Sequence, residues 1–187
     1  MSDELNRGLE GVLVAESELS YIDGDAGRLL YRGYDIDDLA RGASYEEVLY
    51  LLWHGELPTS ALLGAFREGM AVGRDLPEGV LETIARLAER DETPMAMMRT
   101  VASNLSAYDA DSGAGHADLP ANVRTGRRIT AKMPTALAAF ARLRAGDEPV
   151  APRDDLDHAA NFLYMLNGEV PDEVTPATFD MALVLHA

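Results

Sequence analysis

Apolar residues recur every three to four positions through most of this chain, which is the spacing of one face of an α-helix. Turn residues, above all Gly, Pro, Asp and Asn, separate these stretches. The pattern predicts helices over residues 35–41, 44–54, 59–70, 77–88, 93–107, 124–144 and 156–166, and a last one from residue 175 onwards. Aromatic residues make up only 6% of the chain while Ala and Leu dominate, which favours helices over sheet.

Residues 11–36 follow a different pattern. Apolar and polar residues alternate before and after a Gly- and Asp-rich turn at 23–27, as in two strands joined by a hairpin. The alternating apolar positions are Val12, Val14, Leu19 and Tyr21 before the turn, and Leu29 and Tyr31 after it. The predicted fold class is therefore all-α with a short N-terminal β-hairpin.

Residues that begin and end helices support these boundaries. Ser44 and Glu47 have the spacing of a capping box, in which each side chain binds the backbone N–H of the other residue. Further signals are a cap with a first-turn proline at Thr93 and Pro94, a cap at Asp154 before the helix 156–166, a loop at 109–120, and a kink at Pro134.

The last predicted helix lacks an end signal. Residues 181–187 are apolar and include no glycine, no basic last turn and no polar tail. A helix this apolar is usually buried by later elements. We interpret residues 1–187 as one folding unit that is truncated within its last helix, and we expect exposed apolar surface on that helix.

The charge balance bears on partners and environment. Asp and Glu number 32 against 16 Lys and Arg, for a net charge of −16, and Lys132 is the sole lysine. The acids are spread along the chain, so the surface repels nucleic acids and anionic membranes. No apolar run approaches the ~20 residues of a membrane span, and the acidic N-terminus is unlike a signal peptide. We expect a cytoplasmic, salt-adapted protein that binds neither nucleic acid nor membrane.

Histidines are the first candidates for chemistry. The four have no metal-site spacing and the chain has no cysteine, so we expect no metal. His54 suits the negative end of a helix, His116 lies in an acidic loop, and His158 is expected at the edge of the core. His186 lies in the last apolar helix, where a core position and a role in a site are both open.

Acidic and glycine patterns have plain explanations. The stretch 109–113 resembles a calcium loop, but Gly113 occupies a ligand position and Pro120 the place of the final Glu. The spacing of Gly24, Gly27 and Gly33 fits no phosphate-binding motif.

Arginine and methionine patterns point to structure as well. Arg127 and Arg128 are expected to form surface ion pairs. Met95, Met97 and Met98 are expected to pack between helices. The residues by themselves thus predict an acidic, mostly helical domain and no particular activity.

Several stretches, in order along nearly the whole chain, resemble citrate synthases of the bacterial and archaeal type. The first is the hairpin region, at residues 8–12, 20–24 and 27–36. The next helix, 46–58, is also similar, and later matches lie at 93–95, 159–166 and 183–187.

The resemblance implies the N-terminal part of a nearly all-helical large domain, in a homodimer packed through helices 94–107 and 124–143. Citrate synthases condense acetyl-CoA with oxaloacetate and hydrolyse the thioester to citrate and CoA in the tricarboxylic acid cycle, with no metal or other cofactor. In the family an aspartate removes a proton from the acetyl methyl, and two histidines stabilise the enol oxygen and polarise the carbonyl.

The same resemblance places the catalytic residues beyond Ala187. The family motif runs Leu-His-Ala-Asp-His, of which this chain supplies Leu185, His186 and Ala187. His186 is therefore the neighbour of an oxaloacetate-binding residue, and the chain alone is expected to be inactive. Two alternatives stay open: a non-catalytic short paralogue that pairs with a full-length synthase, and a 2-methylcitrate synthase that uses propionyl-CoA.

The acidic composition predicts a strong effect of salt on stability. At ~1 M salt the screening length falls to about 3 Å, so repulsion between surface carboxylates largely disappears. We expect the thermal unfolding midpoint to rise by about 5 °C or more from dilute buffer to molar KCl, which is roughly 2 kcal/mol for a chain of this size. Equal midpoints in the two buffers, measured by circular dichroism, would contradict salt adaptation.

Overall fold

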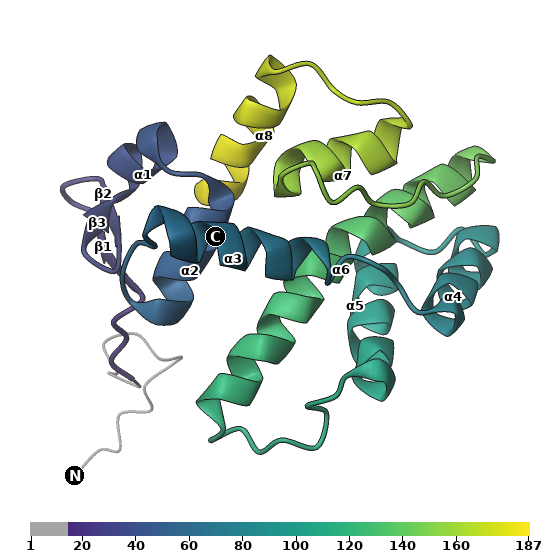
Figure 1. Ribbon diagram of the computed structural model, residues 1–187, viewed down its shortest axis with the longest axis horizontal. Helices are drawn as coiled ribbons and strands as arrows, with labels where there is room; N and C mark the ends of the chain where they lie inside the picture. Colours follow the sequence, from purple (N-terminus) through teal and green to yellow (C-terminus); the bar gives the residue numbers. More distant parts are fainter. Residues whose placement is uncertain (1–14) are drawn as a thin grey trace, which may run out of the picture.

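A long helix, α6 (Leu119–Ala145), runs through the middle of the structure, and α3, α4, α5 and α7 pack against it (Figure 1). The computed structural model describes residues 15–187. Its other helices are α1 (Ile36–Gly42), α2 (Tyr45–His54), α3 (Ser60–Ala71), α4 (Glu78–Glu89), α5 (Pro94–Leu105), the short 3-10 helix η1 (Ser106–Tyr108), α7 (His158–Asn167) and α8 (Val174–Val184). The predicted all-α class is confirmed.

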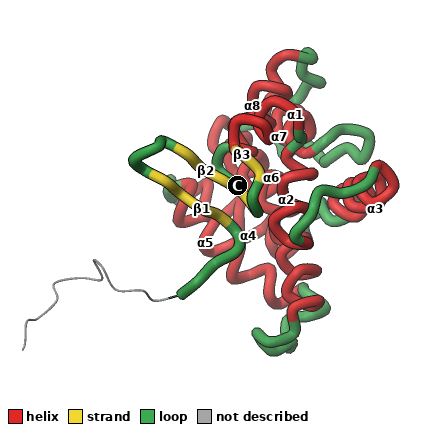
Figure 2. The backbone as a smooth tube through the Cα atoms, turned by 90° about the vertical axis from the view of Figure 1, so that its left-hand side faces the viewer, coloured by secondary structure: helices red, strands yellow, loops and turns green. Residues whose placement is uncertain are grey.

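The hairpin is confirmed and extended by one strand. Strands β1 (Ser20–Asp23), β2 (Arg28–Tyr31) and β3 (Tyr34–Asp35) form an antiparallel sheet in that order, at one side of the helices (Figure 2). The second turn has positive φ at Arg32 and Gly33, as a two-residue hairpin turn requires. An arginine is an unusual residue in this conformation, so the pattern gave no sign of the third strand. Val12 and Val14 lie outside the described residues.

The observed helix caps agree with the predictions where only one nearby residue could cap the helix. Ser44 Oγ accepts from the N–H of Glu47, whose carboxylate accepts from the Ser44 N–H at 2.8 Å. Thr93 Oγ1 caps α5 by accepting from the Ala96 N–H at 3.2 Å. Pro134 lies inside α6.

Two predicted helix starts were wrong. Helix α6 begins at Leu119, five residues before the predicted start, because Asp118 caps it by accepting from the Ala121 N–H at 3.1 Å. Helix α7 begins at His158 instead of 156, because its cap is Asp157 and not Asp154. Both regions contain several aspartates, and the spacing alone does not show which one caps the helix.

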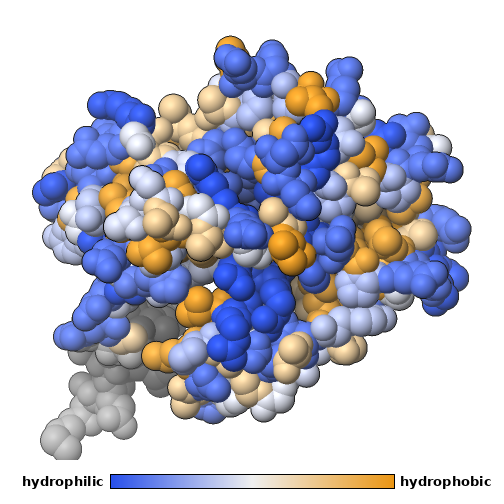
Figure 3. All heavy atoms as spheres, in the orientation of Figure 1, coloured by the Kyte–Doolittle hydropathy of each residue, from blue (hydrophilic) through white to orange (hydrophobic). Residues whose placement is uncertain are grey.

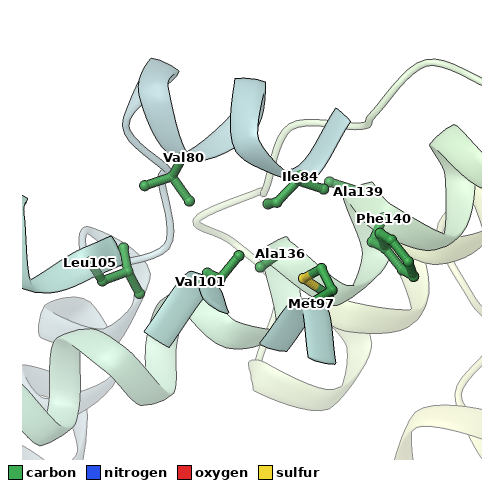
Figure 4. Packing of buried hydrophobic residues seen from close by; sticks show 8 residues of the cluster. All are labelled: Val80, Ile84, Met97, Val101, Leu105, Ala136, Ala139 and Phe140. Carbon is green, nitrogen blue, oxygen red and sulfur yellow. The ribbon is translucent and has the colours of Figure 1, made fainter. Parts of the chain in front are cut away.

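The largest apolar cluster joins α4, α5 and α6 (Figure 4). Its buried members are Val80, Ile84, Met97, Val101, Leu105, Ala136, Ala139 and Phe140. Met97 therefore packs as predicted, whereas Met95 is 74% exposed and does not. A second cluster joins β2, α1 and α2 to α8 through the buried Val184.

Helices α3 and α6 approach closely at a pair of small residues. A Cβ on Gly73, just after α3, would lie 3.2 Å from the Ala131 Cβ and 3.3 Å from the Met70 carbonyl oxygen. The Lys132 ammonium donates to the Gly73 carbonyl oxygen at 2.6 Å. An added Cβ at Gly73 would require these neighbours to move by a few tenths of an ångström.

We predict that Gly73→Ala lowers the free energy of unfolding by about 1–2 kcal/mol, because overpacking forces neighbours apart. Gly64→Ala is the matched control: nothing lies within 4 Å of its added Cβ, and it is inside α3. This control should raise stability by about 0.5–1 kcal/mol through helix propensity. Denaturant unfolding in molar KCl measures both, and a Gly73→Ala midpoint at or above wild type would be inconsistent with the close approach.

Candidate functional site

The N-termini of α2 and α7 meet the middle of α8, and charged side chains gather there. We call this region the helix junction and define it by Tyr45, Glu46, Asp157, His158 and Asp180. Each carboxylate of the junction binds the backbone N–H of a residue in the first turn of a helix. Helix N-termini favour negative charge, so the arrangement is electrostatically consistent.

Glu46 is the most deeply buried acid of the junction, with 1% of its surface exposed. Its Oε1 accepts from the backbone N–H of His158 at 3.0 Å and lies 3.9 Å from the Arg67 Nε. Its Oε2 has no hydrogen-bond partner among residues 15–187. One carboxylate oxygen thus links α2 to α7, and the other is free for a water molecule or another donor.

Arg74 is buried beside this carboxylate, with 3% of its surface exposed. Its Nη1 donates to the Arg153 carbonyl oxygen at 2.5 Å, which holds the segment before α7 against α3. Burial lowers the pKa of Arg74, while the charges of Glu46, Asp154 and Asp157 act in the opposite direction. The guanidinium compensates part of the negative charge at the junction.

Asp180 connects α8 to the N-terminus of α2. Its two carboxylate oxygens accept from the Tyr45 N–H at 3.2 and 3.1 Å. Burial raises the pKa of Asp180 to about 6; the Tyr45 N–H lowers this pKa, and the nearby negative charges of Glu46 and Asp157 raise it. Asp180 therefore changes charge close to neutral pH.

His158 is buried at the same junction, and its ring centroid lies 5.2 Å from that of Tyr45. The pKa of His158 is lowered to about 4, mainly by burial and also by the charge of Arg74, while the charge of Asp157 opposes this shift. The imidazole is neutral at pH 7. It also lines a mostly apolar cavity of about 330 Å³ between α2, α5, α6, α7 and α8.

The structure does not bring the histidines together. His186 follows the end of α8 and is exposed in this chain, with its Nδ1 2.7 Å from the Ala182 carbonyl oxygen. His54 ends α2 and packs on Tyr50, as expected at a helix C-terminus. His116 is exposed in the loop before α6. Among residues 15–187 no group of His, Asp and Glu is arranged to hold a metal ion.

The acidic loop before α6 is neutralised by arginine. The Arg128 Nη2 lies 2.6 Å from both the Asp109 Oδ1 and the Asp111 Oδ2, and Arg124 binds Asp111 at 2.7 Å. These guanidinium groups hold the pKa of both aspartates below the usual range. The ion-pair interpretation is confirmed for Arg128, whereas Arg127 forms no ion pair with any described residue.

Sequence reasoning missed Glu46, Arg74 and Asp180. Glu46 and Arg74 look like ordinary surface charges, since neighbouring residues of α2 and α3 are charged as well. The sequence could have indicated Asp180, because it is the only charged residue in the apolar stretch 179–185. A lone acid in an apolar helix is rarely buried without a partner.

Comparison with known proteins identifies this fold. A family model for the citrate synthase C-terminal domain matches residues 8–187. This chain belongs to the citrate synthase family. It is 63% identical to the citrate synthase of Haloferax volcanii over 188 residues, which cover 100% of this chain and 50% of the relative. A 2-methylcitrate synthase of Mycobacterium tuberculosis is 37% identical over 98% of this chain and 46% of its own length.

Solved structures agree with this result. The citrate synthase of Pyrobaculum aerophilum has a TM-score of 0.90 and 39% identity, over 96% of this chain and 46% of that one. The Thermoplasma acidophilum enzyme, solved with carboxymethyl coenzyme A and oxaloacetate, has a TM-score of 0.89 and 25% identity over 100% of this chain and 48% of that one. The chain spans about half the length of the relatives it matches, and the resemblance to an N-terminal portion of the family is confirmed.

We predict that Asp180→Asn changes how stability depends on pH. The raised pKa of Asp180, about 6 against 3.8, favours folding at low pH, and this contribution is lost as the pH rises through 6. The lowered pKa of His158, about 4 against 6.5, acts oppositely, so stability is lost as the pH falls through this range. In wild type the two effects offset each other, whereas in Asp180→Asn only that of His158 remains.

The variant should therefore lose about 2–3 kcal/mol between pH 6.5 and pH 4, and wild type distinctly less. Denaturant unfolding at several pH values in molar KCl measures the difference. Asp25→Asn, in the exposed turn between β1 and β2, is the control and should follow wild type. Parallel pH profiles for Asp180→Asn and wild type would argue against the offset.

Proposed function

We propose that this chain forms the N-terminal part of a citrate synthase that condenses acetyl-CoA with oxaloacetate and releases citrate and CoA in the tricarboxylic acid cycle. The main support is the likeness to family members along the whole chain, in sequence and in fold. The name of the Mycobacterium relative leaves propionyl-CoA as a second acyl donor to be tested.

We also propose that the chain is inactive without further residues. The reaction needs a carboxylate base and two imidazoles at one place. His158, on α7, is buried beside Tyr45. His186, which follows α8, is exposed. The two imidazoles therefore lie in different environments. His186 stays a predicted neighbour of the oxaloacetate site, with no contact to substrate itself.

Helices α5 and α6 remain the proposed homodimer surface. Ala131, Ala136 and Ala139 are buried within this chain and do not face a partner. Met98 and Met133 are only half-buried and line the apolar cavity beside α6. These two residues are the better candidates for contact with a second subunit.

The acidic surface supports a salt-rich cytoplasm as the working environment. Figure 3 shows hydrophilic residues over most of the visible face, with smaller hydrophobic patches between them. Within residues 15–187, no helix has the length and apolar character needed to cross a bilayer. Both features fit an enzyme of central metabolism that works in aqueous solution.

Activity and native mass test this proposal together. We expect no oxaloacetate-dependent release of CoA thiol from the 187-residue chain in molar KCl, and full activity from the native protein captured from its source. The native mass should be about twice 20.2 kDa, because the chain spans 50% of its Haloferax relative. Thiol release by the 187-residue chain would refute the proposed inactivity.

A native mass of 20.2 kDa would instead favour the short paralogue. In that case the protein should co-purify with a longer synthase, and Met98→Asp or Met133→Asp should weaken the association. The exposed Met95→Asp on the same helix is the matched control and should leave it unchanged.

A further inference from the structure

Helix α8 is attached to the rest of the structure mainly by apolar contacts. Val184 is fully buried in the cluster with β2, α1 and α2. Phe179 stacks on Phe162 of α7 with ring centroids 5.3 Å apart. Figure 1 shows α8 beside α7, with its C-terminal end at α2. These contacts determine which side of α8 faces the core.

Interdigitated apolar side chains limit the sliding of a helix along its axis, but hydrophobic attraction itself is non-directional and selects that position less sharply than a hydrogen bond does. A hydrogen bond is directional and loses strength within a few tenths of an ångström. Among the described residues, the bond from the Tyr45 N–H to the Asp180 carboxylate is the single hydrogen bond between helix α8 and another element. It is therefore the one directional contact that relates α8 to α2.

The end of α8 leads directly to His186. The N–H of Leu185 donates to the Met181 carbonyl oxygen and that of His186 to the Leu183 carbonyl oxygen, both at 3.1 Å, so the backbone continues as helical turns past Val184. The His186 ring is held by its Nδ1, 2.7 Å from the Ala182 carbonyl oxygen. A shift of α8 along its axis would therefore move the His186 ring with it.

We propose that Asp180 is a positioning residue, which fixes α8 on the N-terminus of α2 and thereby places His186 and the segment that follows it. This inference rests on the proposed function, since it assigns that segment to the side of the oxaloacetate site. Asp180 acts through α8 and touches no substrate.

The charged neighbours of Asp180 are consistent with this role. Glu46 on α2 and Asp157 before α7 repel its carboxylate, while Arg67 on α3 attracts it, and the neutral His158 lies on α7. Half-burying a carboxylate that neighbouring charges repel lowers the stability of the fold. A contribution to stability therefore does not explain why residue 180 is an acid. A directional acceptor for the first N–H of α2 does explain it.

The test compares Asp180→Ala, which removes the acceptor, with Asp180→Asn, which keeps one acceptor oxygen. The control is Asp172→Asn, because Asp172 accepts only from Val174 and Thr175 in the first turn of α8 itself. The complete native protein is used for steady-state kinetics and for crystal structures. Asp180→Leu, which also removes the acceptor, replaces Asp180→Ala if the latter does not fold.

In the kinetics, we expect Asp180→Ala to raise the KM for oxaloacetate about 10-fold, the equivalent of a ~1.4 kcal/mol loss in binding. The KM for acetyl-CoA and kcat should stay within about 2-fold, and Asp180→Asn should lie between Asp180→Ala and wild type. In the crystal structure, the segment 183–187 of Asp180→Ala should move along the α8 axis by up to one residue rise, about 1.5 Å.

The inference would be overturned by an unmoved segment 183–187 in Asp180→Ala, or by equal changes in all kinetic constants, which indicate general destabilisation. An effect of Asp172→Asn as large as that of Asp180→Ala would also overturn it. If wild type releases no CoA with oxaloacetate, the proposed function fails, and the crystal structures still decide whether Asp180 positions α8.

Discussion

The carboxylate of Glu46 is almost completely removed from water, and its charge has to be compensated inside the fold. The compensation comes from three elements: the first N–H of α7, the guanidinium of Arg67 on α3, and the buried Arg74 that follows α3. None of these groups is close to Glu46 in the chain. The relative positions of α2, α3 and α7 are therefore tied together by one charge, and α8 is attached to the same place through Asp180.

Charge is used differently on the surface and in the interior. In the acidic loop before α6, arginine pairs with aspartate in a bidentate manner, as Arg128 does with Asp109 and Arg124 with Asp111. Arginine suits this purpose because its planar, weakly hydrated group holds carboxylates in fixed geometry. At the helix junction the acids face helix N-termini and receive less than full compensation. Burial is the main cause of the raised pKa of Asp180, and the nearby negative charges of Glu46 and Asp157 add to it.

Local structure was largely predictable from the sequence, whereas the helix junction was not. The capping box at Ser44 and the cap at Thr93 depend on residues three apart, and both were predicted correctly. Helices α6 and α7 begin at caps that compete with nearby aspartates, so their starts were misplaced. Glu46 and Asp180 accept hydrogen bonds from residues more than a hundred positions away in the chain. A local sequence pattern does not predict such contacts.

The two kinds of contact made by α8 have different physical consequences. Burial of Val184 and stacking of Phe179 supply most of the attraction, but a small slide of the helix would preserve much of it. The bond from Tyr45 to Asp180 contributes less energy and is lost by the same slide. Apolar packing thus holds α8 on the core, and one polar contact selects its position. A helix attached in this way can place a residue at its end, such as His186, with the accuracy of a single hydrogen bond.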